Sequence, residues 1–184
     1  MQLDKVIEGR HSTRKFKDKK PDWRDIIECI DSARWAPMAG DIFSLKFILV
    51  NDEKTIQKLA DAAQQDFIKQ VKYVVVVCTN PRRTLNAYEE RGEIYCRQQA
   101  GAAIQNFLLK IEEKKLATCW VGHFVDYLVK EALKIPDNIN VEAIFPIGYE
   151  FKQRTRRGKI DLDNVLYFHK YKNKKMKSPK KLDV

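Results

Sequence analysis

Residues 71–78 read Val71-Lys72-Tyr73-Val74-Val75-Val76-Val77-Cys78, and this nearly unbroken apolar run decides the fold class. β-Branched side chains favour strands, and apolar side chains at consecutive positions indicate a strand that is covered on both faces. Asn80-Pro81 ends the run, since this dipeptide is typical of a turn. We therefore expect a buried strand within a central sheet.

Helices and further strands are expected on either side of this run. Apolar residues at helical spacing predict helices over residues 2–8, 22–36, 53–68, 89–115 and 125–133. Short apolar segments predict strands over residues 46–50, 118–121 and 141–147. The middle of helix 89–115 is apolar on most sides, which favours a buried position. Helices outweigh strands, and the alternation indicates an α+β or α/β layered domain around a central sheet.

The composition is that of a globular chain. Its 184 residues, 44% of them apolar and 33% charged, suffice for one domain with a real core. No apolar run reaches the roughly 18–20 residues that span a bilayer. The first residues lack the apolar core of a signal peptide, which favours the cytoplasm. The four cysteines show neither a CxxC pair nor metal-type spacing, so we expect reduced thiols and no metal site.

The formal net charge of +10 is unevenly distributed. Residues 170–184 contain seven lysines and one acid, and so carry +6 of the +10. A basic tail of this kind is usually solvated or lies along a partner. A non-enzymatic binding module for nucleic acid is the alternative from a different functional class, with the tail as its contact surface.

The segment Arg10-His11-Ser12-Thr13-Arg14 is the first candidate binding element. Its two guanidinium groups, its hydroxyls and its closely spaced backbone amides can converge on one phosphate or another anionic group. The plain alternative is a basic surface turn that follows a helix.

Three more segments have the composition of ligand-binding loops. Small residues in Trp35–Asp41 let the backbone approach a flat ligand, although an ordinary helix end has the same pattern. In Leu116–Phe124, Gly122 follows a predicted strand, where its amide can face a ligand. The fourth segment, Ile147–Tyr149, precedes a cluster of arginines that begins at Arg154.

In their order and spacing, these segments resemble the nitroreductase family of flavoproteins. The matching motifs are R-H-S-T-R-K-F (10–16), A-P-M-A-G-D (36–41), A-A-I-Q-N-F-L-L (102–109), T-C-W-V-G-H-F (118–124) and I-F-P-I-G-Y (144–149). The resemblance extends from about Val6 to Tyr171. It implies an α+β three-layer sandwich, with a central mixed but mainly antiparallel sheet flanked by helices, in an intertwined homodimer. Residues 1–171 would form the FMN-binding domain and residues 172–184 a basic tail.

The resemblance also assigns residues to the FMN phosphate. Arg10 and Ser12, with the backbone around His11, would hold it. Arg154 and Arg156 match a late basic pair of the family that returns to the same phosphate. Several arginines suit a group that carries about two negative charges.

Other residues are assigned to the flavin ring. Arg14 would lie toward the N1/O2 edge, where a positive group stabilises the reduced, anionic flavin. The backbone amide of Gly122, beside Val121, would face N5. Gln64 or Gln65 would contact the pyrimidine side.

The segment Pro37-Met38-Ala39-Gly40-Asp41 would reach the flavin from the partner subunit, so that the dimer is necessary for a complete site. The chain departs from the family here. Asp41 stands where Asn is common, and Phe43-Ser44-Leu45 stand where Gln-Pro-Trp is common. An ionised Asp only accepts hydrogen bonds and adds a charge, so we expect Asp41 to pair with a nearby arginine or to make the flavin harder to reduce.

The implied activity is transfer of hydride from NADH or NADPH, through flavin N5, to a small oxidant such as a nitroaromatic or a quinone, with ping-pong kinetics. No catalytic side chain is predicted, because the cofactor carries the chemistry. A flavoprotein that acts on flavin itself, or on a specialised metabolite, is the second flavin-based interpretation.

Overall fold

The structure is a computed structural model that describes residues 2–152 and 158–176. The chain divides into two compact units, Met1–Lys152 and Gln153–Val184, and each is described by itself. The first unit holds the sheet and most of the helices. The cysteines at positions 29, 78, 96 and 119 all lie in it as buried free thiols.

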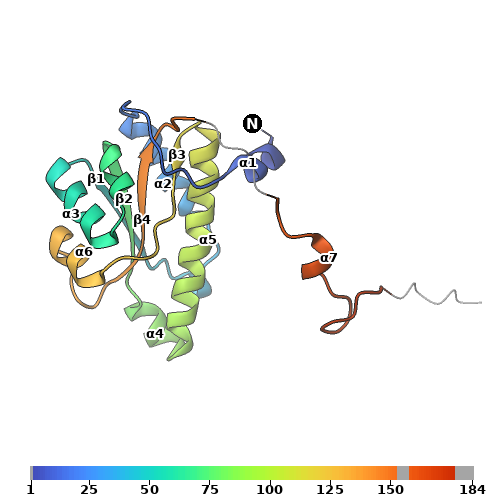
Figure 1. Cartoon of the computed structure of the whole chain (residues 1–184). Coiled ribbons are helices and arrows are strands. Elements are labelled where there is room, and N and C mark those ends of the chain that lie inside the picture. Colours follow the sequence, from blue (N-terminus) through green and yellow to red (C-terminus); the bar gives the residue numbers. More distant parts are fainter. Residues whose placement is uncertain (1, 153–157, 177–184) are drawn as a thin grey trace, which may run out of the picture. The chain divides into compact units, whose positions relative to one another are not determined.

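A four-stranded antiparallel sheet forms the centre of the first unit (Figure 1). Its strands are β1 (Leu45–Val50), β2 (Tyr73–Thr79), β3 (Ala117–Thr118) and β4 (Asn140–Gly148), in the order β1-β2-β4-β3. Every residue of β2 is buried, which confirms the prediction from its apolar run. Its side chains alternate between two cores, because successive residues of a strand point to opposite faces.

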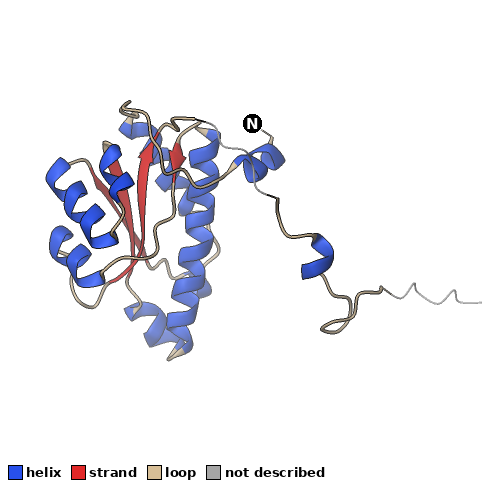
Figure 2. Cartoon of the chain, in the orientation of Figure 1, coloured by secondary structure: helices blue, strands red, loops and turns tan. Residues whose placement is uncertain are grey.

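Helices cover both faces of the sheet (Figure 2). The core on one face contains residues of α2 (Trp23–Ala33) and α5 (Arg91–Glu113), around Phe107 and Phe145. The core on the other face contains residues of α3 (Glu53–Ala63) and α6 (Asp126–Leu133). The shorter elements are α1 (Leu3–Gly9), α4 (Arg82–Tyr88) and the 3-10 turns η1 (Ala39–Asp41) and η2 (Asp66–Gln70). The predicted α+β three-layer arrangement is confirmed.

Two predicted elements are shorter than their sequence patterns indicate. The predicted helix 53–68 ends at Ala63, because Gln64 adopts a left-handed conformation (φ 53°) and η2 follows. The predicted strand 118–121 is limited to β3, and Val121 rejoins the sheet only through a bridge to Ile144. Both differences are turns, and Ile68 of η2 and Val121 are nevertheless buried in the core.

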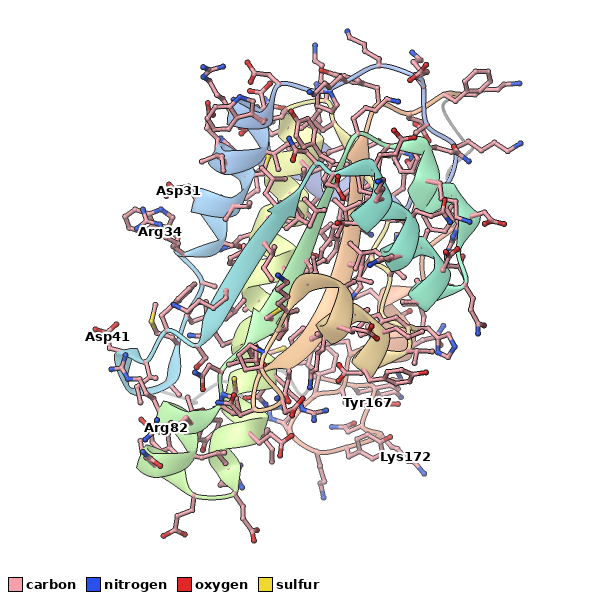
Figure 3. All side chains as sticks on the ribbon, turned by 90° about the vertical axis from the view of Figure 1, so that its left-hand side faces the viewer. Asp31, Arg34, Asp41, Arg82, Tyr167 and Lys172 are labelled. Atoms are coloured by element: carbon pink, nitrogen blue, oxygen red, sulfur yellow. The ribbon has the colours of Figure 1, made fainter. Side chains whose placement is uncertain are left out.

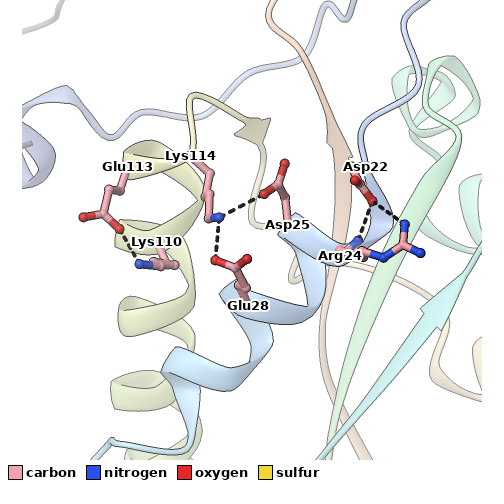
Figure 4. A network of polar contacts seen from close by, with 7 residues as sticks. All are labelled: Asp22, Arg24, Asp25, Glu28, Lys110, Glu113 and Lys114. Carbon is pink, nitrogen blue, oxygen red and sulfur yellow. Dashed lines mark hydrogen bonds and ion pairs between the residues drawn. The ribbon is translucent and has the colours of Figure 1, made fainter.

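Ion pairs fix the C-terminal end of α5 against α2 (Figure 4). Lys114, which directly follows α5, lies 2.5 Å from the carboxylate of Glu28 and 2.9 Å from that of Asp25. Its hydrogen bonds to Glu28 and Asp25 raise the pKa of Lys114. β3 begins three residues after Lys114, so the ion pairs of Lys114 help to position this strand. The candidate binding segment 10–14 runs beside it.

The second unit is small within its described residues. It contains the short helix α7 (Leu162–Val165), and the rings of Tyr167 and Tyr171 meet edge to face with centroids 4.9 Å apart. Among the described residues, no helix has both the length and the apolar character that a membrane crossing requires.

Candidate functional site

The segment 10–16 runs in extended conformation beside β3. Thr13 donates its amide hydrogen to the Thr118 carbonyl (2.9 Å), and Ser12 forms a parallel bridge with the same residue. Phe16 forms a second bridge, to Glu150, and its ring is buried. Because Thr13 and Phe16 point inward, Ser12 and Arg14 are left exposed on the outer side. The polar groups of the predicted phosphate end are therefore held on an ordered backbone.

His11 has a hydrogen-bond acceptor at each ring nitrogen. Its Nδ1 lies 2.8 Å from the Gly9 carbonyl oxygen, and its Nε2 lies 2.9 Å from Oε1 of Glu150. Both nitrogens can donate only when the imidazole is protonated. The hydrogen bond to Gly9 and the contact with Glu150 raise the pKa of His11, and partial burial opposes them. A protonated His11 forms an ion pair with Glu150, and this pair fixes the ring beside Arg10 without adding net charge.

We expect the pKa of His11 to lie above 6.5 in the folded chain, and replacement of Glu150 by Gln to lower it. An NMR titration of the His11 ring measures both values. Because the folded-state pKa is raised, the contribution of this pair to stability is full below about pH 6.5 and is lost as the pH rises through the folded-state pKa.

Thr13→Val is the matched control for that titration. Thr13 also donates to Oε1 of Glu150 (3.3 Å), and the variant removes this hydrogen bond while the carboxylate stays beside His11. The raised pKa should persist in T13V. An unchanged His11 pKa in E150Q would contradict the assignment of Glu150 as its partner.

The C-terminal end of α3 and the turn η2 lie beside the segment 10–16. Together with this segment they form a surface that we call the wall around Arg14. The Arg14 guanidinium lies over the Phe67 ring, 5.9 Å from its centroid, and the Phe16 amide donates to Oε1 of Gln70 (3.0 Å). Gln64 caps α3 and is exposed. The predicted residues Arg14 and Gln64 are thus attached to neighbouring elements of one wall.

The loop after β3 reaches the same wall. Val121 is fixed by two backbone hydrogen bonds with Ile144 (3.0 and 2.9 Å), and the Val125 amide donates to the Ala62 carbonyl (2.8 Å) near the end of α3. Gly122 lies between these anchors and is exposed. Among the described residues, none accepts a hydrogen bond from its amide. The structure therefore presents a free backbone donor where the sequence predicts one.

The predicted partner segment lies at the other end of the sheet. Leu45, four residues after the end of η1, pairs with Thr79 at the C-terminal end of β2. Thr118, beside the segment 10–16, pairs with Ile147, and Ile147 pairs with Tyr73 at the N-terminal end of β2. Six residue steps of β2 separate Tyr73 from Thr79, which is about 20 Å along a strand. Within one chain, residues 37–41 therefore do not join the wall around Arg14.

Two further predictions have separate outcomes. Asp41 is exposed and forms no ion pair with any residue in the described ranges, so the expected pairing with an arginine is absent from the single chain. Arg154 and Arg156 lie outside the described residues. The predicted return of this basic pair to the phosphate stays a prediction.

Comparison with known proteins identifies the family. The model of the nitroreductase family matches residues 7–71 and 62–149, which together cover most of the chain. The chain belongs to the nitroreductase family. The matched ranges contain the five motifs on which the resemblance rests, and the family that they indicated is confirmed.

Two relatives of this nitroreductase-family chain are identical to it at about a quarter of the aligned positions. A protein of Archaeoglobus fulgidus, named provisionally as an NADH dehydrogenase/NAD(P)H nitroreductase, is 27% identical over an alignment of 150 positions, which covers 79% of this chain and 83% of the relative. An iodotyrosine deiodinase of Thermotoga neapolitana is 25% identical over an alignment of 160 positions, which covers 78% of this chain and 86% of the relative.

Solved structures confirm the fold. A nitroreductase family protein of Clostridium novyi NT superposes with a TM-score of 0.75 at 28% identity, covering 94% of this chain and 96% of that one. An FMN-dependent nitroreductase of Clostridium difficile superposes with a TM-score of 0.78 at 22% identity, covering 90% and 98%.

Sequence reasoning missed Glu150, Phe67 and Gln70. Glu150 directly follows the Ile-Gly-Tyr motif, and an acid at that point was the available signal for a partner of the basic segment. Phe67 was assigned to the predicted helix 53–68, and Gln70 lies in the short gap between that helix and the predicted strand. Their contacts arise only because that helix stops at Ala63 and η2 turns back toward Arg14.

Proposed function

We propose that this chain binds FMN as a homodimer and transfers hydride from NADH or NADPH to a small oxidant, such as a nitroaromatic or a quinone, in two alternating half-reactions. Family membership supports a general oxidoreductase role. The observation that carries the proposal is the wall around Arg14, where the ordered basic segment places Arg14 over the Phe67 ring and the loop with the exposed Gly122 is hydrogen-bonded to the end of α3.

The residues of the wall fit the parts of FMN. Arg10 and Ser12 supply charge and a hydroxyl for the phosphate. Arg14 would hold the anionic edge of the ring, and the Gly122 amide would donate a hydrogen bond to N5. Bound FMN supplies the hydride chemistry itself. The protein would bind it, orient it and exclude water from one face.

The separation of residues 37–41 from the wall favours a dimer. These residues lie at the opposite end of the sheet in their own chain, and Gly40 and Asp41 adopt left-handed conformations (φ 56° and 55°) that expose the turn. A second copy related by a two-fold axis can bring this turn to the first copy's wall, and the reverse contact follows by symmetry. Each complete site would then contain residues of both copies.

The test uses the purified full chain. Incubation with FMN should give a yellow protein that retains flavin through gel filtration and has twice the 21.6 kDa mass of one chain. Anaerobic NADH or NADPH should bleach the flavin absorbance, and a nitroaromatic or a quinone should restore it. Because one relative is named an iodotyrosine deiodinase, iodotyrosine belongs among the acceptors. A protein that stays colourless after incubation with FMN would refute the proposal.

A further inference from the structure

A pocket of about 370 Å³ lies beside the start of β1, apart from the wall around Arg14. Ser44, Lys46, Asn80, Arg82 and Arg83 contribute to its lining. Local hydrogen bonds order it, because Asn80 donates its amide hydrogen to the Ser44 carbonyl (2.9 Å) and accepts one at Oδ1 from the Arg82 amide (3.1 Å). The pocket is therefore built on fixed backbone rather than on a loose loop.

The cations of this pocket lack partners. Within the described ranges, Lys46, Arg82 and Arg83 form no ion pair. Along the chain, the acid nearest to Lys46 is the exposed Asp41, and the acid nearest to Arg82 and Arg83 is the exposed Glu89. Within the described ranges, neither forms an ion pair. Three positive side chains around one concave surface repel one another and attract a compact anion.

A buried hydroxyl is the second, independent observation. The Ser44 residue is only 4% exposed, and its Oγ has no hydrogen-bond partner among the described residues. Its amide is already used, since it donates to Oε1 of Gln99 (2.9 Å). A buried hydroxyl without a partner costs free energy, and rotation of the Ser44 side chain toward a ligand oxygen in the pocket would remove that cost. Ser44 also belongs to the triplet in which the chain departs from the family motif.

We propose that Ser44, Lys46, Arg82 and Arg83 bind a phosphate group of an organic ligand whose reactive end lies at the flavin site. Ser44 is three residues from Asp41, so their Cα atoms are at most about 11 Å apart. Figure 3 shows Asp41 and Arg82 at the same end of the first unit. The link to the flavin rests on the proposed function, whereas the phosphate site itself does not. Two ligands share this chemistry, the 2′-phosphate of NADPH and a phosphorylated oxidant.

Direct binding is tested first, with inorganic phosphate as the probe and the FMN-loaded full chain as the protein. Titration calorimetry at constant ionic strength should show saturable binding. Arg82→Gln, Arg83→Gln and Ser44→Ala should each weaken it, by about tenfold for the arginines, because a hydrogen bond to a charged group is lost. The matched control Lys54→Gln removes one exposed charge from α3 and should leave phosphate binding unchanged.

Phosphate binding that is equal in R82Q, S44A and the unaltered chain would overturn the site, and so would an equal loss in K54Q. If the chain fails to retain FMN, the same titrations are run on the flavin-free protein. Loss of the proposed function and loss of the phosphate site are therefore separate results.

Steady-state kinetics then distinguish the two ligands. If the phosphate belongs to the donor, R82Q should raise the KM for NADPH about tenfold and leave that for NADH unchanged. If it belongs to the oxidant, R82Q should raise the KM for 4-nitrophenyl phosphate and leave both donors and nitrobenzene unchanged. If R82Q left the KM of each of these four compounds at its value in the unaltered chain, the link to the flavin site would be contradicted.

Discussion

The double replacement of Arg10 and Arg14 by Gln is expected to lower FMN affinity by more than about a hundredfold, since each hydrogen bond to a charged group contributes about 1.5–3 kcal/mol and 1.4 kcal/mol is a factor of ten. Both side chains are exposed or half-buried beside an ordered backbone, so their removal should not disturb the core. Fluorescence titration with FMN measures the loss, and thermal unfolding of the flavin-free variant checks the fold.

The two arginines can be separated with riboflavin, which has the same ring system but no phosphate. Arg10→Gln should weaken FMN binding and leave riboflavin binding unchanged, because Arg10 is assigned to the phosphate. Arg14→Gln should weaken both, because Arg14 lies over Phe67 in the wall assigned to the ring. This difference tests the orientation of the flavin rather than its mere attraction to positive charge.

Lys15→Gln is the control for general electrostatics. Lys15 lies in the same segment and is exposed. No contact with FMN is assigned to it, and its backbone carbonyl already accepts a hydrogen bond from the Phe151 amide (3.0 Å). The variant removes one positive charge and should bind FMN with nearly unchanged affinity. Equal losses in K15Q, R10Q and R14Q would show that net charge alone attracts FMN, and the assigned roles would be wrong.

The central sheet and its helices were accessible from sequence because their signals are local. The buried strand β2 follows from its own apolar run, and the alternation of its side chains between two cores follows from strand geometry. The polar segment 10–14 was recognisable for the same reason. Its residue types and spacing lie within five consecutive positions.

The contacts that complete the site join distant parts of the chain, and no local pattern contains them. His11 and Glu150 are 139 residues apart, and Phe16 and Gln70 are 54 apart. The sequence also gives no signal for the left-handed Gln64 that ends α3, because glycine is the residue that usually occupies such a position. The pocket around Ser44 needs the pairing of β1 with β2 to bring Asn80 and Arg82 to it.

Replacement of Gly92 by Ala is expected to destabilise the first unit by about 3 kcal/mol, because extra atoms in a tightly packed place force the backbone to move. Gly92 is buried near the start of α5, where the chain reverses after α4. An added Cβ would overlap the carbonyl group of Thr84 and the amide nitrogen of Leu85. These are backbone atoms of α4, so no side chain can rotate away, and α4 would have to separate from α5.

Gly101→Ala is the matched control in the same helix. No atom lies within 4 Å of the Cβ that this variant would add, apart from the helix itself and the chain neighbours. Ala is favoured over Gly in a helix by up to about 1 kcal/mol, so G101A should be as stable as the unaltered chain or more stable. Calorimetry at one protein concentration should show a lower Tm for G92A by about 5–10 °C and no decrease for G101A. A G92A chain with an unchanged Tm would mean that α4 moves freely relative to α5, and the close contact at Thr84 would not be a determinant of the fold.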